Sequence, residues 1–490
     1  MSQAIDRAAG PQRVSAVPLS QKVFYGLGML GNQMFPAALG IFMVVLVQGL
    51  GFPGWMWGIL FFLPRLSDAL TDPVMGFVSD NTKSRWGRRR PYILIGAVVA
   101  GVAYILMWQL SPDNSVAFNF WYFLAFAFLF YLGLTIFATP YVAMGYEMSS
   151  DFHERTRLMA VSQWIGQVAW IIVPWFWVLI YDDKLFDDAA EGARSLSVWV
   201  GVGCMLLAAA PAVFCKTQPV DPSTLQDLSR KNLGTNVRRL VWGFGQTLKL
   251  KPFRRICIAT FCVFNAFNTV AGLSWFIIVH YMNGGDAGPD GAGAWPSWFG
   301  TISAVTTCVL VIPIVAWMAQ NLGKRRAFLI SQSISILGYV GFWWGFNPEN
   351  PMWMFLPLPF FAFGIGGLFT IMMSMTADVC DLDELETGER REGVFGAVYW
   401  WMVKFGFAIA GLGGGLILNA VNLGDGAEGE PNLTGLRLAY IAVPILGTLV
   451  AIVVMWGYDL NEERSREIRE QIDSRKAAGG ASGSDSAPQV

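Results

Sequence analysis

Two carboxylates lie four residues apart inside an apolar stretch of the chain, in the segment SDALTDP that begins at Ser67. On a helix, Asp68 and Asp72 share one face, and Thr71 lies beside it. An ionised carboxylate is costly in hydrocarbon, so such acids face a cavity or a partner. Together with hydroxyl groups they offer an all-oxygen cluster that suits a hard cation such as Na⁺. Because two acids this close repel each other when both are ionised, H⁺ could substitute for the metal.

Two basic side chains lie in similar apolar surroundings. Arg65 precedes the first acid by three residues, and Lys404 lies in the middle of WWMVKFGFAIAG. A lone ammonium in the membrane needs an anion, so we expect Lys404 to approach Asp68 and Asp72 when no cation is bound. The alternative is that the acids form fixed ion pairs with Arg65 and Lys404 and never bind an ion.

Membrane-spanning helices are the elements predicted to hold these side chains. The 490 residues are 54% hydrophobic and 14% charged, whereas soluble domains carry about 25% charged residues. A span needs about twenty apolar residues, which predicts an all-α membrane protein of twelve transmembrane helices in two six-helix repeats. The expected spans are 22–49, 55–79, 91–111, 119–143, 158–181 and 197–215, then 254–281, 295–319, 326–346, 352–375, 394–420 and 437–457.

The same pattern divides the chain into parts. We expect an N-terminal tail over 1–21, a first six-helix bundle over 22–215 and a polar central loop over 216–253. A second bundle should follow over 254–457, and the tail over 458–490 should be largely disordered, because its end is rich in Gly, Ala and Ser.

Basic residues predict the orientation, since short cytoplasmic loops are enriched in Lys and Arg. They cluster after the second and eighth spans, in the central loop and in the C-terminal tail, whereas the loops on the other side are nearly bare. Both termini are therefore expected in the cytoplasm of a multi-pass protein of the plasma membrane, the bacterial inner membrane. The polar first twenty residues do not have the form of a signal peptide.

Several functions are not supported. The net charge of −1 gives no basis for nucleic acid binding, and the six scattered cysteines suggest neither disulfides nor zinc. No nucleophile–base pair or phosphate loop indicates an enzyme, and no cofactor is expected beyond Na⁺ or H⁺ as coupling ion. We expect a monomer whose partners are the lipid bilayer and a small-molecule substrate.

A weak internal repeat supports a duplicated unit. TKSRWGRRRPYILIG follows the second span and QNLGKRRAFLIS follows the eighth, so a glycine and basic residues lead into the next span at equivalent positions. With its twelve spans the chain resembles the major facilitator superfamily. DALTDPVMGFVSDNTKSRWGRRRPYILIG, TIFATPY, ADVCDLDELETGERREGVFGA and VKFGFAIAG resemble the signatures of its glycoside–pentoside–hexuronide:cation symporters.

This resemblance implies a fold, a function and a set of residues. Members of the family bind Na⁺, Li⁺ or H⁺ on carboxylates of the second helix, with help from the fourth, and couple the cation to sugar uptake. The matching residues are Asp68, Thr71, Asp72 and Thr135, with Lys404 and Arg65 in charge balance. Melibiose-transporting members hold the sugar with further acids on the first and fourth helices, where this chain has Gln33 and Ala138.

Polar amides and tryptophans inside the spans are the candidates for contact with a sugar. Amides can bond sugar hydroxyls, and aromatic rings can stack on the apolar face of a pyranose. The candidates are Gln33, Gln163, Gln167, Asn265, Asn268, Trp164, Trp400 and Trp401. Core packing is the alternative for each tryptophan, and an amide-lined site suggests a neutral or weakly charged substrate.

The basic loop after the second span is a candidate gate at the cytoplasmic side. Asp80 with Arg88, Arg89 and Arg90 could form a latch between helices that is made and broken as the two halves rock. The alternative is that these arginines only set the topology and contact lipid headgroups.

The function that these features favour is symport of a sugar or glycoside, driven by Na⁺ or H⁺, by alternating access. Two alternatives remain: symport of a different amphiphile such as a lysolipid, which needs an apolar half-cavity, and a membrane sensor that transports nothing.

Overall fold

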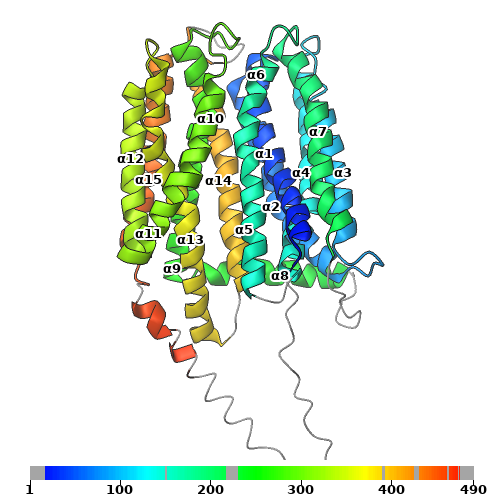
Figure 1. Ribbon diagram of the computed structural model, residues 1–490, viewed down its shortest axis with the longest axis vertical. Coiled ribbons are helices and arrows are strands. Elements are labelled where there is room, and N and C mark those ends of the chain that lie inside the picture. Colours follow the sequence, from blue (N-terminus) through cyan, green and yellow to red (C-terminus); the bar gives the residue numbers. More distant parts are fainter. Residues whose placement is uncertain are drawn as a thin grey trace, which may run out of the picture.

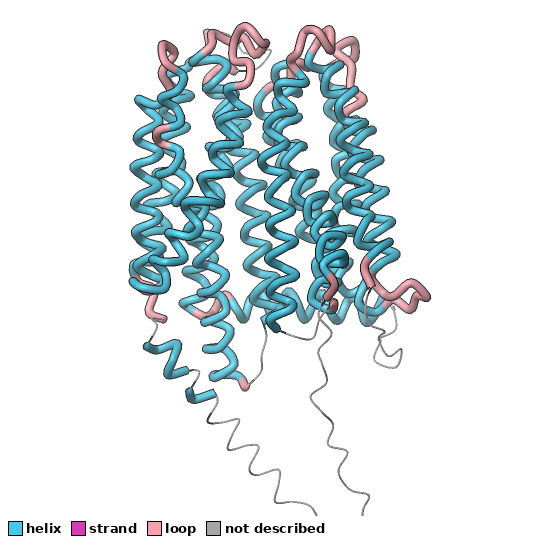
Figure 2. The backbone as a smooth tube through the Cα atoms, viewed as in Figure 1, coloured by secondary structure: helices cyan, strands magenta, loops and turns pink. Residues whose placement is uncertain are grey.

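The computed structural model describes residues 17–148, 152–216, 230–388, 392–423, 430–460, 463–468, 470–472 and 474, and these form helices, turns and loops with no strand (Figure 2). Two bundles of long helices stand side by side, and one short helix crosses their lower end (Figure 1). The predicted all-α class with two six-helix repeats is confirmed.

The N-terminal half holds six spans. They are α1 (Leu19–Gln48), α2 (Gly54–Asn81), α3 (Arg90–Met107), α4 (Val116–Glu147), the continuous run of α5 (Phe152–Ile172), η1 (Val173–Trp175) and α6 (Phe176–Ile180), and finally α7 (Ala189–Phe214).

The C-terminal half repeats this plan. Its spans are α9 (Lys251–Phe276) with the π-helical η3 (Ile277–Met282), α10 (Trp295–Thr306) with the π-helical η4 (Thr307–Val311) and α11 (Ile312–Leu322), α12 (Lys324–Gly345), η5 (Pro351–Phe355) with α13 (Leu358–Thr387), α14 (Glu392–Ala420), and α15 (Leu433–Trp456).

The segment expected as a central loop contains a helix, α8 (Arg230–Thr247). Apolar residues recur there at Leu233, Val237, Leu240 and Phe244, which is a helical spacing. Arg238, Arg239 and the polar residues around them make the segment too polar to predict as a span. The C-terminal tail also begins with helical residues over 463–468, where Ile468 is buried in the core of the C-terminal half.

Eleven helical segments of the described chain are long and apolar enough to cross a membrane. The twelfth span is α2, which has 28 residues but whose apolar sequence is interrupted by Arg65, Asp68 and Asp72. The one span of the twelve that is not among these eleven is thus the one that carries the paired acids.

Equivalent helices pack in the same pairs in both halves, as expected for a duplicated unit. In the first half α1 packs on α5 and α7, and α3 packs on α4 and α7. In the second half α9 packs on α14 and α15, and α12 packs on α13 and α15. The two halves meet through α2 against α14 and through α5 against α10, which are also equivalent pairs.

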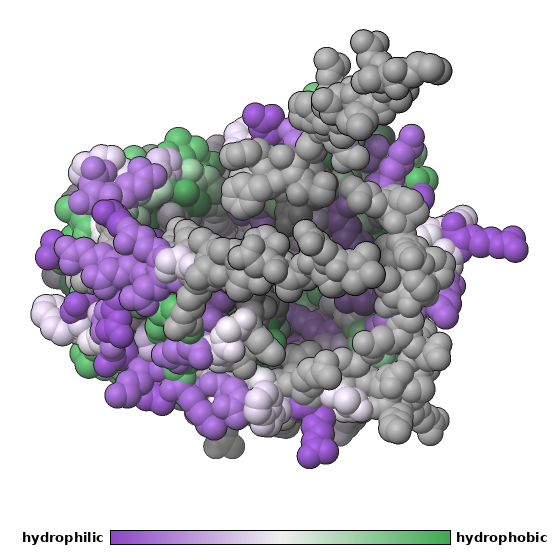
Figure 3. Space-filling view, turned by 90° about the horizontal axis from the view of Figure 1, so that it is seen from below, coloured by the Kyte–Doolittle hydropathy of each residue, from purple (hydrophilic) through white to green (hydrophobic). Residues whose placement is uncertain are grey.

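The two ends of the bundle differ in charge. We call the end with the loop 82–89, Gly323 and α8 the basic end; both ends of the described chain lie there (Figure 1), and hydrophilic side chains gather on this face (Figure 3). The other end, with the loops 49–53 and 283–294, we call the opposite end.

Glycines bring α2 and α14 into backbone contact near the opposite end. A Cβ on Gly415 would lie 2.6 Å from the backbone nitrogen of Gly58, and one on Gly54 would lie 2.7 Å from that of Asn419. Real side chains do not fit at such distances, so glycine is required at this crossing. Gly58 likewise packs on the backbone of Leu412.

The helices α5 and α10 close the same end on the other side of the molecule. The Ser297 hydroxyl donates to the carbonyl of Pro174 at 2.6 Å, and the Thr301 hydroxyl donates to that of Ile171 at 3.2 Å. Trp177 of α6 also stacks on Trp275 of α9, with ring centres 5.0 Å apart. The carbonyls of Ile171, near the end of α5, and of Pro174, in η1, thus accept bonds from the other half.

The hydrophobic cores show where the halves are joined. Side chains of both halves share one core at the opposite end, where Phe299, Leu418 and Tyr440 belong to the same cluster as Phe42. Toward the basic end the C-terminal half has a core of its own, which includes Phe253 and Phe395. The structure is therefore closed between the halves at the opposite end.

Gly415→Val should open this contact, because the new side chain collides with Gly58. In a variant lacking native cysteines, a cysteine replacing the buried Leu418 should react several-fold faster with a maleimide in detergent once Gly415→Val is added. The control is Gly413→Val on the same helix, where a Cβ meets nothing within 4 Å. Equal labelling in both variants would show that the glycine contact does not hold this end closed.

Candidate cation and substrate site

Three helices meet at the candidate site with side chains in matching rows. On α2, residues 61, 65, 68 and 72 recur at helical spacing and so share one face. On α4 the row is 131, 135 and 139, and on α14 it is 404, 407 and 411. Each row faces the other two, as the contacts described below show, so the site belongs to both halves of the molecule.

Asp68 is the shielded carboxylate of the pair. The Thr135 hydroxyl of α4 donates a short hydrogen bond to Asp68 Oδ1, and the Thr71 hydroxyl lies 3.2 Å from that of Thr135. Both threonines were predicted from the sequence. The Asp68 side chain is only 10% exposed, so its charge depends on these contacts and on the lysine described next.

Asp72 lies one helical turn closer to the basic end and is less shielded. The Thr139 hydroxyl donates to Asp72 Oδ1 at 3.3 Å, and the side chain is 32% exposed. The sequence analysis did not select Thr139, although it lies four residues after Thr135 in TIFATPY and so shares its face. This four-residue spacing is the sequence pattern from which Thr139 could have been predicted.

Lys404 bridges the two acids across the boundary between the halves. Its ammonium lies 2.9 Å from Asp68 Oδ2 and also donates a short hydrogen bond to Asp72 Oδ2. The ammonium thus occupies the position between the carboxylates where a small cation would be coordinated. Two carboxylates and the hydroxyls of Thr71, Thr135 and Thr139 are hard oxygen ligands, suited to Na⁺ or H⁺.

Arg65 does not form an ion pair with Asp68 or Asp72. The alternative in which these acids form fixed ion pairs with both Arg65 and Lys404 therefore does not hold for Arg65. Its guanidinium lies over the Phe407 ring at 4.4 Å, and 5.4 and 5.8 Å from the ring centres of Phe61 and Tyr131. It is 9% exposed and its buried Nε has no hydrogen-bond partner. The sequence analysis missed these aromatic neighbours because only the packing of α4 and α14 brings two of them here.

The predicted amides lie at several places on the helices. Asn265 donates to the carbonyl of Gly406, two residues after Lys404, at 3.4 Å, whereas Asn268 donates to the carbonyl of Phe264 on its own helix. Gln167 lies 3.9 Å from Cys308 in the other half. Gln33 packs beside Gly166, and Gln163, on the same helix, is exposed.

The predicted tryptophans are not gathered at one point. Trp401 stacks on Phe405 and contacts the edge of the Phe244 ring of α8. It therefore packs α14 against α8. Trp164 is 81% exposed and Trp400 is 47% exposed. Trp164 and Trp400 are therefore available to a ligand or to lipid, whereas the Trp401 ring already packs on Phe405 and Phe244.

The predicted gate residues form a network within the N-terminal half. Arg89 pairs with Asp80 at 2.7 Å and with Glu147 at 2.9 Å, and Arg88 also pairs with Glu147. Arg90 donates to the carbonyl oxygens of Ala212 and Val213 instead. These bonds tie α2, α3, α4 and α7 together at the basic end.

Two further ion pairs brace the basic end. Lys324 pairs with Asp378 at 2.6 Å. Lys324 follows Gly323 as Arg88 follows Gly87, so this pair corresponds to the Arg88–Glu147 pair of the first half. Lys22 pairs with Glu154 at 3.0 Å, and this hydrogen bond, together with one from Arg157, holds the pKa of Glu154 below its usual value.

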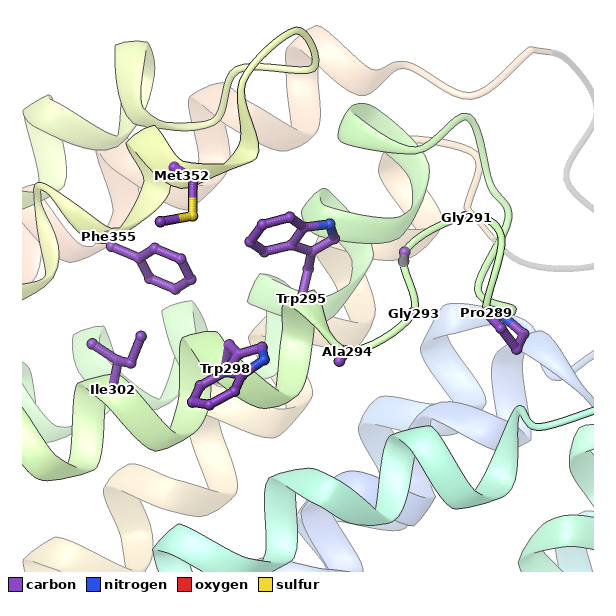
Figure 4. Close-up of a pocket in the computed structure, with 10 residues that line it drawn as sticks. Pro289, Gly291, Gly293, Ala294, Trp295, Trp298, Ile302, Met352 and Phe355 are labelled. Atoms are coloured by element: carbon purple, nitrogen blue, oxygen red, sulfur yellow. The ribbon is translucent and has the colours of Figure 1, made fainter.

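A cavity of about 470 Å³ lies away from this site, at the opposite end (Figure 4). It is lined mainly by apolar side chains, among them Trp295, Trp298, Met352 and Phe355. None of the predicted site residues lines it, so it carries no part of the proposed chemistry.

Comparison with known proteins agrees with the geometry. The sequence profile of a family described as MFS/sugar transport protein matches residues 24–462. The glucuronide carrier protein homolog of Escherichia coli is 25% identical over 93% of this chain and 95% of its own. The lactose permease of Leuconostoc lactis is 24% identical over 96% of this chain and 74% of its own.

Solved structures show the same fold at low identity. The nucleoside transporter NupG superposes with a TM-score of 0.63 and 13% identity over 90% of this chain and 99% of its own. The chain belongs to the MFS/sugar transport family, and its resemblance to the glycoside–pentoside–hexuronide:cation symporters within the major facilitator superfamily is confirmed. It is a multi-pass membrane transporter, not an enzyme.

The contact between Lys404 and Asp68 should appear as an interaction energy in a double-mutant cycle. Lys404→Ala leaves both acids without their ammonium, and Asp68→Asn should recover part of the lost stability. We expect a coupling of about 1–3 kcal/mol from denaturation in detergent. Lys324→Ala combined with Asp68→Asn is the control and should be additive, because Lys324 pairs with Asp378. Additivity in both cycles would mean that Lys404 does not stabilise the acids.

Proposed function

We propose that the protein is a secondary active transporter that couples the entry of Na⁺ or H⁺ to uptake of a sugar or glycoside by alternating access. The observation that carries the proposal is the position of Lys404 between Asp68 and Asp72, at the contact of α2 and α14. The ammonium and the coupling ion would compete for the same two carboxylates.

This competition provides a mechanism for coupling. Without a cation, Lys404 neutralises the acids and holds α14 of the second half against α2 of the first. A bound cation takes over the carboxylates and the threonine hydroxyls and releases the lysine. Each arrangement favours a different packing of the halves, and a ligand that binds one packing better shifts the equilibrium toward it.

The sugar is proposed from the relatives and from the amides. The relatives are named for glucuronide and lactose, and Asn265, Gln33 and Gln167 offer uncharged hydrogen-bonding groups on helices of both halves. A lysolipid or a non-transporting sensor is not favoured by these relatives. Asp80 and Arg88–Arg90 would then brace the N-terminal half as a rigid body that rocks against the other.

The orientation is part of the proposal. Lys and Arg concentrate on the basic end, so we place that end in the cytoplasm of the bacterial inner membrane. Contact between the halves at the opposite end then corresponds to a carrier that is closed to the outside. The carrier is proposed to act as a monomer, since both halves of the site come from one chain.

Asp72→Asn tests the cation site. The amide keeps the shape of the side chain but removes one of the two negative charges that attract the ion. Cation-driven accumulation in proteoliposomes should be lost, whereas exchange of substrate without a gradient should be partly retained. Thr139→Val should weaken Na⁺ less, by about tenfold or below, because it removes a neutral ligand. If Asp72→Asn accumulates substrate like the parent, the ion binds elsewhere.

Reporter fusions test the orientation. A green fluorescent protein fused after Val490 should fluoresce, and an alkaline phosphatase at the same position should be inactive, because the phosphatase folds only outside the cytoplasm. A phosphatase inserted at Asp286, in the loop of the opposite end, serves as the positive control. An active phosphatase after Val490 would reverse the proposed orientation.

A further inference from the structure

The segment between the two halves contains a helix that the proposed transport cycle does not use. This helix, α8, lies across the basic end and packs on α2 of the first half and on α14 of the second (Figure 1). These are the two helices that are joined by the contact of Lys404 with Asp68 and Asp72. Any molecule that holds α8 in place therefore acts on the contact between the halves.

One face of α8 packs against the bundle. The Phe244 ring contacts the Trp401 ring of α14 edge-on, with ring centres 5.2 Å apart. A Cβ on Gly243 would lie 3.1 Å from the Val394 side chain, so α8 and α14 approach each other closely there. Thr247 is fully buried. Gly243, Phe244 and Thr247, at helical spacing, therefore form the inner face of α8.

The opposite face of α8 is exposed. Arg238, Trp242 and Gly245 follow one another at spacings of four and three residues, so they share one face, and all three are exposed. Trp242 is 61% exposed. Lys249, in the turn that follows the helix, is exposed as well. A tryptophan beside basic residues on a helix at the end of a membrane bundle is typical of segments that lie among lipid headgroups.

The charged residues of this segment are all positive. Between Arg230 and Arg255 the chain contains no acidic residue. Its basic residues are Arg230, Lys231, Arg238, Arg239, Lys249, Lys251, Arg254 and Arg255. Among the described residues, Arg255 pairs with Asp459, whereas no acid lies within ion-pair distance of Arg238 or Lys249. The exposed face of α8 therefore favours an anionic partner, and it would repel a second copy of itself.

We propose that the exposed surface formed by Arg238, Trp242 and Lys249 binds the headgroups of anionic phospholipids such as phosphatidylglycerol. Arg238 and Lys249 donate to the lipid phosphates, and the Trp242 ring lies at the boundary between headgroups and acyl chains. Because the same helix packs on α2 and α14, a bound lipid stabilises the arrangement in which α8 contacts both halves. The inference does not depend on which substrate the protein carries.

A lipid titration with a fluorescent probe on α8 tests the proposal. In the full-length protein without its native cysteines, a bimane is attached to a cysteine that replaces Gly245, where a Cβ meets nothing within 4 Å. Dioleoyl-phosphatidylglycerol in the detergent micelles should shift the bimane emission to the blue at about twentyfold lower lipid content than dioleoyl-phosphatidylcholine, since each of two charges contributes about fivefold. Equal responses to the two lipids would overturn the proposal.

Variants assign the lipid preference to α8. Arg238→Gln and Lys249→Gln should each reduce the preference for phosphatidylglycerol about fivefold, whereas Trp242→Ser should weaken both lipids alike, because it removes an apolar contact. Arg157→Gln is the matched control, since Arg157 is also exposed at the basic end but already pairs with Glu154. A loss of preference in Arg157→Gln as large as in Arg238→Gln would show that the lipids respond to overall charge, which contradicts a site on α8.

Two further probes distinguish other occupants of the same surface. Inorganic phosphate and soluble polyglutamate, each added to phosphatidylcholine micelles, should leave the bimane emission unchanged. A blue shift with phosphate alone would assign the surface to a free anion, and a blue shift with polyglutamate would assign it to an acidic protein. Either result would overturn the lipid proposal.

A second readout uses the parent protein with all its cysteines. After incubation with equal amounts of the two lipids, native mass spectrometry should find phosphatidylglycerol retained in about fivefold or greater excess over phosphatidylcholine. This excess should fall in the double variant Arg238→Gln, Lys249→Gln. No excess on the parent protein, or the same excess on the double variant, would show that α8 does not bind anionic lipid.

Discussion

The contact of one ammonium with two carboxylates, Lys404 with Asp68 and Asp72, is the interaction on which the rest of the structure depends. Charges in the membrane interior are stable only when paired or hydrated, so the three side chains must stay close. Because the acids belong to the first half and the lysine to the second, their pairing also fixes how the halves approach. In the proposed mechanism these same bonds link occupancy of the cation site to the arrangement of the two halves.

The surrounding helices are adapted to permit this contact. Glycines near the opposite end let the backbones of α2 and α14 touch, so the lysine can reach the acids about three turns further along. Threonines at matching positions of α4 donate to each carboxylate, which keeps both acids oriented whether the lysine or an ion is present. The charged network at Asp80, Arg88, Arg89 and Glu147 holds α2, α3 and α4 together at the basic end.

The two basic residues of the site, which look similar in the sequence, are separated by their surroundings. Lys404 reaches both acids, and in the proposed mechanism it competes there with the coupling ion. Arg65, on the same helix face as the acids, instead lies among three rings contributed by α2, α4 and α14. An ammonium is a compact charge that an ion can replace, whereas a planar guanidinium stacks on aromatic rings and still offers donors to an anion.

The sequence alone determined the membrane class, the twelve spans, the duplicated halves and the pairing of Asp68, Thr71 and Asp72 on one face, because apolar length, loop charge and helical periodicity are local properties. It also indicated Thr135 and Lys404 through family motifs. The sequence also predicted that Lys404 approaches the two acids, and the structure shows its ammonium in contact with both. Only the tertiary structure decided that Thr139 binds Asp72, that Arg65 is held by Phe407 and Tyr131, and that Trp401 packs on α8. These are contacts between residues on separate helices, from 66 to more than 300 positions apart in the sequence. The rotation of one helix against another sets them, which no local pattern encodes.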